Sequence, residues 1–316
     1  MSEQVATFAA RARAELAKCI VGQEAALGQL LVVVLTGGHA LVEGFPGLAK
    51  TLAVKTLARI LQLDFQRVQC TADLMPADII GASVFNMATS SFALHQGPVF
   101  TDLLLVDEVN RTPPRTQAAL LEAMEERQVT IDGVRHGLSA NFTVFATQNP
   151  VEFEGTYPLP EAQLDRFLMK IVVGYPTAEQ EQAILNSYQQ GFNPHDLDRM
   201  GLAPLENTLL QAARREVAAV KVEPALFRYI TTLARRTRDL PSLSLGASPR
   251  ATVCLMQVAK AMAALDGRDY LIPDDVKAAV LPVLRHRILL KPEADLEGLT
   301  TDHVLAQVIA GVEVPK

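Results

Sequence analysis

A short apolar run that leads into a glycine-rich turn constrains the fold of this chain more than any other feature. The run Leu41–Thr51 reads LVEGFPGLAKT, in which Gly44 and Gly47 allow a tight turn that ends at Lys50 and Thr51. Such a turn aims backbone N–H groups at anionic oxygens, and a helix beginning near Lys50 adds its positive end. The lysine would reach the outer phosphates and the Thr51 hydroxyl would ligate Mg²⁺. The run therefore predicts a nucleoside triphosphate site between a strand and a helix.

One position departs from the usual form of this motif. The residue before the lysine is usually glycine, and here it is Ala49. A helical conformation at Ala49 would tolerate the additional methyl group. The alternative is an ordinary turn between a strand and a helix, because short patterns also occur by chance. The residues of this segment that we expect to bind the nucleotide are Gly44, Phe45, Pro46, Gly47, Leu48, Ala49, Lys50, Thr51 and Leu52.

Composition excludes several classes of protein. The chain has 316 residues, 49% of them hydrophobic, which is enough for a globular protein with two domains. Its net charge of −6 and the lack of a basic block argue against nucleic acid as the main partner. Three widely spaced cysteines indicate neither disulfides nor a zinc site. Without a signal peptide or a membrane-length apolar segment, we expect a soluble, cytoplasmic protein in a reducing compartment.

Apolar strands alternate with helices between residues 40 and 173, which is typical of a parallel sheet covered by helices. Strands are predicted at His39–Glu43, Phe65–Thr71, Leu103–Val106, Phe142–Ala146 and Phe167–Val173, and helices at Lys50–Leu61 and Pro114–Glu126. After Pro176 the pattern changes to successive helices with no convincing strand. The sequence therefore predicts an α/β core over residues 1–174 and a helical domain over residues 175–316.

Two adjacent carboxylates follow the strand predicted at residues 103–106. The segment 103–108 reads LLLVDE. Ligands of parallel sheets bind at the carboxyl ends of the strands, so Asp107 would lie beside the Mg²⁺ bound by Thr51. Glu108 could orient or deprotonate an attacking water molecule. A solvent-exposed strand end is the alternative, but together with the glycine-rich turn these acids favour metal-assisted phosphoryl transfer.

Three further polar residues are candidates for the same site. Asn149 follows the strand predicted at 142–146 and could hydrogen-bond the γ-phosphate or the water molecule. Arg166 precedes the last predicted strand, and Arg250 lies in the first turn of a helix that Ser248 should cap. Arginine can hold phosphate oxygens and stabilise charge that develops during transfer. Alternatively, Asn149 belongs to a turn, and each arginine is a surface residue or an ion-pair partner.

The order of these motifs resembles that of AAA+ ATPases, and longer segments resemble the MoxR family in particular. The short segments are VGQ at 21–23, GFPGLAKT at 44–51, LLLVDE at 103–108, ATQNP at 146–150, LDRF at 164–167 and SPRA at 248–251. The longer segments are 73–81, 107–133 and 147–167, and LIPDDV with VLRHRI at 283–288 extends the resemblance towards the C-terminus. The resemblance implies an AAA+ P-loop core, with a parallel β-sheet flanked by helices, and a C-terminal all-α lid domain.

The same resemblance implies a role for each candidate residue. Val21 and Gly22 would lie near the adenine. Asn149 is similar to a sensor 1 residue and Arg250 to a sensor 2 residue. Arg166 resembles the arginine finger, which acts on the ATP of the neighbouring subunit, so a homo-oligomer, usually a hexameric ring, is expected. The implied catalytic residues are Lys50, Glu108, Asn149, Arg166 and Arg250, and the implied metal ligands are Thr51 and Asp107.

Two predicted hairpins resemble insertions found in this family. Residues 83–97 carry apolar side chains around a polar turn and resemble the insert in helix 2. Residues 128–141, with an Asp-Gly turn at 132–133, resemble the pre-sensor 1 hairpin. In related rings such hairpins face the pore and contact client proteins, and the alternative is a structural hairpin that seals a sheet edge. Residues 135–137 read RHG where the family often has an aromatic and proline-containing stretch, which does not favour a client contact there.

The function that the resemblance implies is Mg²⁺-dependent ATP hydrolysis by an oligomer that remodels or matures a partner protein. MoxR relatives act as chaperone-like factors, often on partners with a von Willebrand factor A domain. The alternatives are a magnesium-chelatase-type ATPase subunit, a nucleotide-switched scaffold with little hydrolysis, and a P-loop small-molecule kinase. A kinase would not account for Asn149, Arg166 and a helical C-terminal domain. Nucleic-acid remodelling is disfavoured because the chain is acidic and lacks a basic, aromatic surface pattern.

Overall fold

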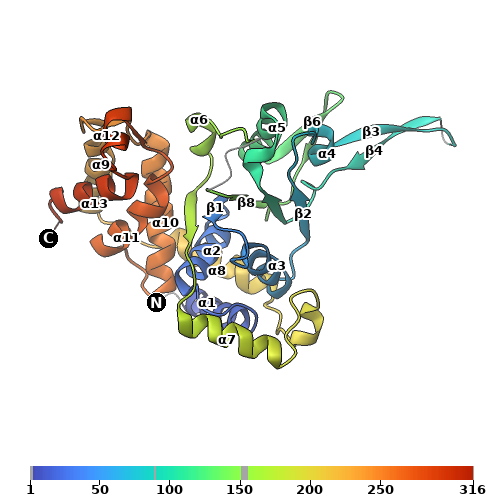
Figure 1. Cartoon of the computed structure of the whole chain (residues 1–316), viewed down its shortest axis with the longest axis horizontal. Helices are drawn as coiled ribbons and strands as arrows, with labels where there is room; N and C mark the ends of the chain where they lie inside the picture. The colour runs from blue at the N-terminus through green and yellow to red at the C-terminus, as the bar shows by residue number, and fades with distance from the viewer. Residues whose placement is uncertain (1–2, 89, 151–155, 316) are drawn as a thin grey trace.

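A parallel sheet covered by helices forms the first half of the molecule, and a helical region lies beside it (Figure 1). The computed structural model describes residues 3–88, 90–150 and 156–315. Within these residues the central sheet has five strands in the order β2-β5-β8-β1-β9, and every neighbouring pair is parallel. The strands are β1 (Ala40–Gly44), β2 (Phe65–Gln69), β5 (Leu103–Asp107), β8 (Thr143–Gln148) and β9 (Met169–Val173). Their ends agree with the predicted ends to within two residues, which confirms the predicted parallel sheet.

Helices pack on both faces of this sheet because successive side chains of a strand point to opposite sides. The core helices are α1 (Glu3–Ala17), α2 (Glu24–Thr36), α3 (Lys50–Ile60), α4 (Pro76–Ile80), α5 (Pro114–Glu126) and α6 (Glu161–Leu164). On β5, Leu103 and Leu105 belong to the apolar cluster that includes α1, α2 and α3. Leu104 and Val106 belong to the second cluster, which includes α5. The unbroken apolar sequence of β5 therefore reflects burial on both faces.

The C-terminal region is helical, with one exception to the prediction. Its helices are α7 (Ala178–Gln189), α8 (Asn207–Ala219), α9 (Pro224–Arg238), α10 (Pro249–Leu265), α11 (Pro273–Leu284), α12 (Pro292–Leu296) and α13 (Thr301–Gly311). The expectation of no strand there was wrong, because β10 (Leu243–Leu245) pairs with β11 (Leu289–Leu290). Such short strands give no alternating pattern in the sequence. The division of the chain into two domains at residue 174 stays a prediction. Helix α8, which follows that residue, packs on α1 and α2, which precede it.

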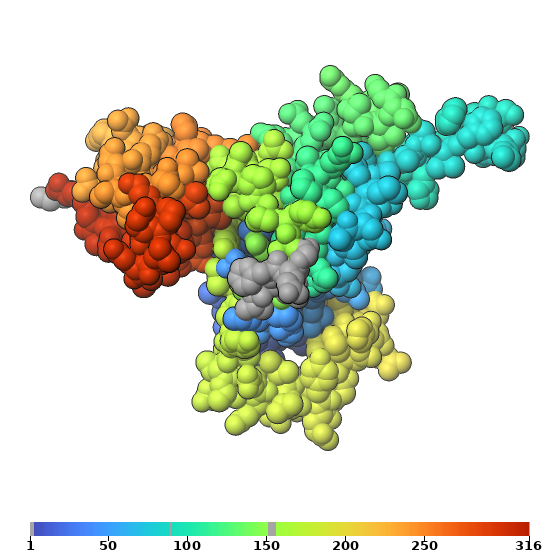
Figure 2. All heavy atoms as spheres, turned by 45° about the horizontal axis from the view of Figure 1, so that its top comes forward, coloured from blue at the N-terminus to red at the C-terminus, as the bar shows by residue number. Residues whose placement is uncertain are grey.

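Both predicted hairpins are present in the core. The first consists of β3 (Gly81–Asn86) and β4 (Ser91–Gln96), and it projects from the body of the molecule (Figures 1 and 2). Its exposed apolar side chains include Met87 and Phe92, which are 88% and 74% exposed. The second consists of β6 (Gln128–Ile131) and β7 (Val134–Gly137), joined by a turn whose two residues have the positive φ angles of a type I′ turn. Among the described helices, none is long and apolar enough to cross a bilayer.

A buried histidine links the sheet to α5. His39 Nδ1 accepts a hydrogen bond of 2.9 Å from Val144 N, so the proton of the neutral ring lies on Nε2, which donates to Met124 O at 3.0 Å. Burial lowers the pKa of His39 to about 4. The folded state therefore holds this ring neutral at pH values where an unfolded chain would take up a proton.

This difference predicts a loss of stability in mild acid. The unfolded histidine binds a proton below about pH 6.5 and the folded one only below about pH 4, so the penalty grows as the pH falls between these values. Between pH 7 and pH 5 we expect His39 to lower the free energy of unfolding by about 2 kcal/mol. Urea unfolding at both pH values should show that His39→Asn, which retains an acceptor for Val144 N, removes this part of the loss. The exposed His95, changed to Asn, is the control and should leave the loss unaltered. An equal loss in wild type and His39→Asn would contradict the assignment.

Candidate functional site

The glycine-rich turn connects β1 to α3 as predicted, and it folds around the side chain of Lys50. The Lys50 ammonium donates hydrogen bonds to Gly44 O and, at 3.3 Å, to Phe45 O. Burial lowers the pKa of Lys50, while the carboxylates of Asp107 and Glu108 act in the opposite direction. The turn thus places a partly desolvated cation where an anionic group would be stabilised.

The conformation of the turn explains its residues. A Cβ atom at Gly44 would lie 2.7 Å from Val173 O on β9, so the chain can leave the sheet there only as glycine. Gly47 has a φ angle of +82°, in the left-handed region that glycine adopts without strain. Ala49 has a φ angle of 55° and is the N-cap of α3, so it does not have the right-handed helical conformation that would tolerate its methyl group without strain. The cause is geometric, because the turn must reverse direction immediately before the first residue of the helix.

Asp107 ends β5 beside Thr51, as predicted. The Thr51 hydroxyl donates to Asp107 Oδ2 over 3.2 Å, and the Thr147 hydroxyl donates to Asp107 Oδ1 over 3.0 Å. Arg67 Nε donates to the same Oδ2 atom at 2.6 Å. The Asp107 carboxylate is buried and satisfied on both oxygens, so its orientation towards α3 is fixed.

Glu108 follows Asp107 in a left-handed conformation with a φ angle of 60°, which turns its side chain away from that of Asp107. Its backbone N–H donates to Thr147 Oγ1 at 2.9 Å. Its Oε2 atom accepts hydrogen bonds from Gln69 Nε2 at 2.9 Å and from Arg111 Nη1 at 3.2 Å. The two carboxylates therefore have separate partners, which suits separate roles.

A cleft of about 420 Å³ brings these groups together. Asn149, which is buried at the end of β8, also lines it, as the sequence predicted for the carboxyl edge of the sheet. Sequence reasoning missed Arg67, Gln69 and Thr147. Arg67 and Gln69 are two residues apart on β2, the strand next to β5, so their side chains point to the same face of the sheet. This period of two was the signal that could have identified them. The residues lining the cleft are Pro46, Gly47, Leu48, Ala49, Lys50, Thr51, Leu52, Arg67, Gln69, Asp107, Glu108, Thr147, Asn149, Tyr188 and Pro194.

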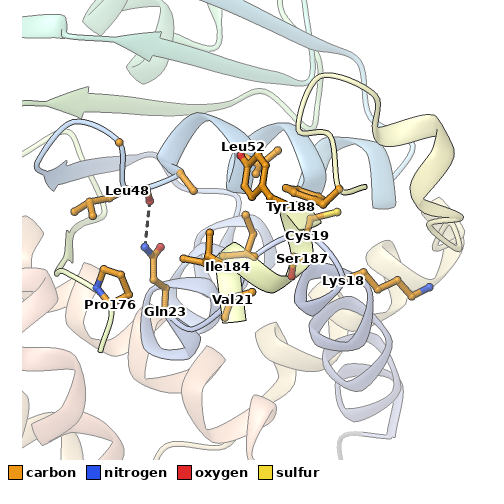
Figure 3. A pocket seen from close by; sticks show the side chains of 14 residues that line it. Lys18, Cys19, Val21, Gln23, Leu48, Leu52, Pro176, Ile184, Ser187 and Tyr188 are labelled. Atoms are coloured by element: carbon orange, nitrogen blue, oxygen red, sulfur yellow. Dashed lines mark hydrogen bonds between the residues drawn. The ribbon is translucent and has the colours of Figure 1, made fainter. Parts of the chain in front are cut away.

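A second, smaller pocket of about 140 Å³ adjoins the same turn (Figure 3). Val21 lines it, and Gln23 Nε2 donates to Leu48 O at 3.1 Å, which ties the segment before α2 to the turn. Ile184 and Tyr188 of α7 also line the pocket (Figure 3). These two residues could not be predicted, because only the folded chain brings α7 to the turn. Gly22 is adjacent, and a Cβ atom there would lie 2.6 Å from the Gln180 side chain.

The two arginines lie together but outside the cleft. Arg166 Nε is 2.8 Å from Glu125 Oε2, and Arg250 Nη1 is 2.8 Å from Glu125 Oε1. One carboxylate on α5 therefore holds both side chains, and in the part of the chain that the structure describes neither arginine lines the cleft around Lys50. No pattern in the sequence distinguishes Glu125 from the other acidic residues of α5.

The left-handed conformation of Ala49 predicts that glycine is better tolerated there than alanine. Ala49→Gly should raise the free energy of unfolding by about 0.5–1 kcal/mol, because the strain of a left-handed alanine exceeds the entropic cost of glycine. The same change at Ala53, inside the right-handed α3 helix, should lower it by about 1 kcal/mol. Urea unfolding of the two variants makes the comparison. If both changes destabilise equally, Ala49 is not left-handed in solution.

Comparisons with known proteins identify the family to which this chain belongs. Residues 39–169 match the model of the ATPase family associated with various cellular activities (AAA), and residues 235–308 match the AAA lid domain. Uncharacterized protein YeaC of Bacillus subtilis is 45% identical over 90% of this chain and 88% of its own length. A crystal structure described as that of a candidate ATPase from Cytophaga hutchinsonii has a TM-score of 0.89 and 40% identity, and the match covers 99% of this chain and 98% of that one. Chaperone MoxR1 of Mycobacterium tuberculosis is 42% identical over 97% of this chain and 82% of its own length. This chain therefore belongs to the MoxR family of AAA+ ATPases.

Proposed function

We propose that this protein hydrolyses ATP with Mg²⁺ in an oligomer and uses the reaction to remodel or mature a partner protein. The observation that carries the proposal is the junction of Thr51 and Asp107, 3.2 Å apart beside Lys50, with Glu108 next in the chain. Phosphate, metal and water could meet at this one edge of the sheet. Family membership supports nucleotide hydrolysis, and the geometry supports the assignment of residues to each step.

The oxygen atoms of Thr51 and Asp107 suit a magnesium ion. Mg²⁺ prefers oxygen ligands at about 2.0–2.1 Å in an octahedron, so neighbouring ligands lie about 3 Å apart. The separation of Thr51 Oγ1 and Asp107 Oδ2 is 3.2 Å, which fits that spacing. Bound there, Mg²⁺ would neutralise charge on the phosphate oxygens. Arg67 shares Asp107 Oδ2 and would move or release this atom when the metal binds.

The two adjoining hollows suit the two ends of a nucleotide. The pocket between Val21 and Tyr188 has mostly apolar walls and can enclose a planar base. The cleft over Lys50 can take the phosphate chain, because the turn offers backbone N–H groups and the start of α3. Because Leu48, Ala49 and Leu52 line both hollows, a base in one and phosphates in the other lie on either side of the same turn.

Glu108 is the proposed base for the attacking water molecule. Its carboxylate lies at the cleft and is held by Gln69, so it can accept a proton from water beside the terminal phosphate. Asn149 would orient the same water or the γ-phosphate through its amide. Thr147 supports both acids, because it donates to Asp107 and accepts from the Glu108 backbone.

Arg166 and Arg250 are proposed to act on the ATP of a neighbouring subunit. Their pairing with Glu125, away from the cleft of their own chain, supports this assignment. A ring, hexameric by resemblance to the family, would bring one subunit's arginines to the next subunit's γ-phosphate. Arginine there would stabilise the charge of the transition state.

The partner is proposed from the family and from one surface. The M. tuberculosis relative is named a chaperone, and MoxR relatives often act on proteins with a von Willebrand factor A domain. The projecting β3–β4 hairpin exposes Phe85 and Phe92, which suits contact with a partner. We propose a chaperone-like role in the cytoplasm, in which ATP turnover drives this contact.

The catalytic assignment predicts a separation of binding from hydrolysis. Glu108→Gln should lower kcat by about 10²–10⁴-fold, because the general base is lost, while ATP affinity stays within a few fold. Lys50→Ala should abolish ATP binding. The exposed Glu126 on α5, changed to Gln, is the matched control and should leave turnover unaltered. Phosphate release and binding of a fluorescent ATP analogue measure the two quantities. Normal turnover by Glu108→Gln would show that Glu108 is not the base.

The partner assignment predicts an ATP-dependent complex. Affinity-tagged Glu108→Gln protein incubated with ATP should retain a purified von Willebrand factor A domain protein encoded by the same organism, and should release it without nucleotide. Changing Phe85 and Phe92 to Ser should reduce retention at least tenfold and leave basal ATP turnover unaltered, because the hairpin projects away from β1 and α3, which flank the glycine-rich turn (Figure 1). Equal retention with and without ATP would contradict nucleotide-driven remodelling.

A further inference from the structure

A buried arginine of the lid forms several hydrogen bonds with the segment that carries Arg166. Arg287 follows α11, and its side chain is 1% exposed. Its Nε atom donates to Asp165 Oδ1 at 2.7 Å, and Nη1 donates to Leu168 O at 2.9 Å. Its Nη2 atom donates to Asp165 O at 3.2 Å and to Phe167 O. One guanidinium thus binds the chain on both sides of Arg166.

Two further lid residues hold the same segment. Ser248, the N-cap of α10, donates from Oγ to Asp165 Oδ2 at 3.0 Å. His286 Nε2 lies 3.2 Å from Phe167 O and donates to it, and burial keeps the pKa of this ring well below its usual value, so the ring is neutral. We call Ser248, His286 and Arg287, with their acceptors in residues 165–168, the lid clasp. It joins α10 and α11 to the short link between α6 and β9.

The hydrogen bonds of the lid clasp determine the position of residues 165–168 more than they stabilise the interface. A buried guanidinium is costly to desolvate, and an apolar contact of the same size would stabilise the interface about as well. Apolar contacts are not directional, whereas the hydrogen bonds of Arg287 fix the backbone on both sides of Arg166. The clasp also sets the position of Arg250, which lies two residues after Ser248 and shares Glu125 with Arg166.

We propose that Arg287 is a positioning residue for Arg166. By holding the backbone on both sides of Arg166, it determines where the Arg166 guanidinium lies relative to the ATP of the neighbouring subunit. The inference rests on the proposed function, because it concerns a site shared between subunits. A displacement of about 1 Å in such a group can cost about a hundredfold in rate. Movement of the lid is then transmitted to Arg166 of the same subunit, and so to hydrolysis in the next one.

Mixed oligomers test this proposal. A Lys50→Ala subunit binds no ATP but still offers Arg166, and an Arg166→Ala subunit binds ATP but offers no finger. Each should be inactive alone, and a mixture should recover turnover at the interfaces where the two meet. Arg287→Lys is then introduced into one parent at a time. Lysine keeps the positive charge but cannot reproduce the planar set of donors.

We expect Arg287→Lys to lower the recovered rate at least tenfold in the Lys50→Ala parent, which offers Arg166. In the Arg166→Ala parent it should change that rate less than twofold. Arg285→Lys is the matched control, because Arg285 pairs at 3.0 Å with Asp302 inside the lid, and it should have little effect in either parent. If Arg287→Lys does not fold, as judged by circular dichroism, Asp165→Asn takes its place and should show the same asymmetry.

The outcomes separate the two proposals. If the unmodified parents do not recover turnover when mixed, the shared active site is wrong, and the positioning role is overturned with it. If the parents recover turnover but the Arg287 change has the same effect in either parent, the shared site stands and Arg287 has only a structural role. An effect confined to the ATP-binding parent would also overturn the positioning role.

Discussion

Parallel pairing of β8 with both β1 and β5 brings the carboxyl ends of three strands, which are distant in sequence, to one edge of the sheet. β1 delivers the glycine-rich turn, β5 delivers Asp107 and Glu108, and β8 delivers Thr147 and Asn149. A shift of one residue in either pairing would turn these side chains to the other face of the sheet. The buried apolar side chains of β5 and β8 prevent such a shift, so the core that stabilises the protein also aligns the candidate site.

The features that could be predicted from the sequence are those that depend on neighbouring residues in the chain. The buried strands were located because they are nearly continuous apolar runs, and the turn because glycine and lysine have few other reasons to occur in that order. The left-handed conformation of Ala49 was not predicted, because the path of the chain decides it and the preference of alanine does not. Tyr188 at the smaller pocket and Glu125 between the arginines depend on tertiary packing that no local pattern records.

The charged side chains proposed to act in hydrolysis already have partners within the chain, which a ligand must displace. Lys50 bonds to the carbonyls of its own turn, Arg67 bonds to Asp107, and Glu125 bonds to both Arg166 and Arg250. Each of these internal contacts must break before the same side chain can make the contact proposed for it during hydrolysis. In the proposed mechanism, nucleotide, metal and neighbouring subunit would each displace an internal hydrogen bond as well as water. These internal contacts would lower the affinity for each ligand, and they keep the unliganded charges from repelling one another.

The β3–β4 hairpin has a property that its shape alone does not show. Residues 81–97 contain no Lys, Arg, Asp or Glu, although the segment extends into solvent. Long-range attraction acts between charges and weakens as salt screens them, so an uncharged arm can neither be steered towards a partner nor be driven from it by ionic strength. Any partner of this arm must therefore be held by apolar contacts and uncharged hydrogen bonds, without an ion pair to the arm itself.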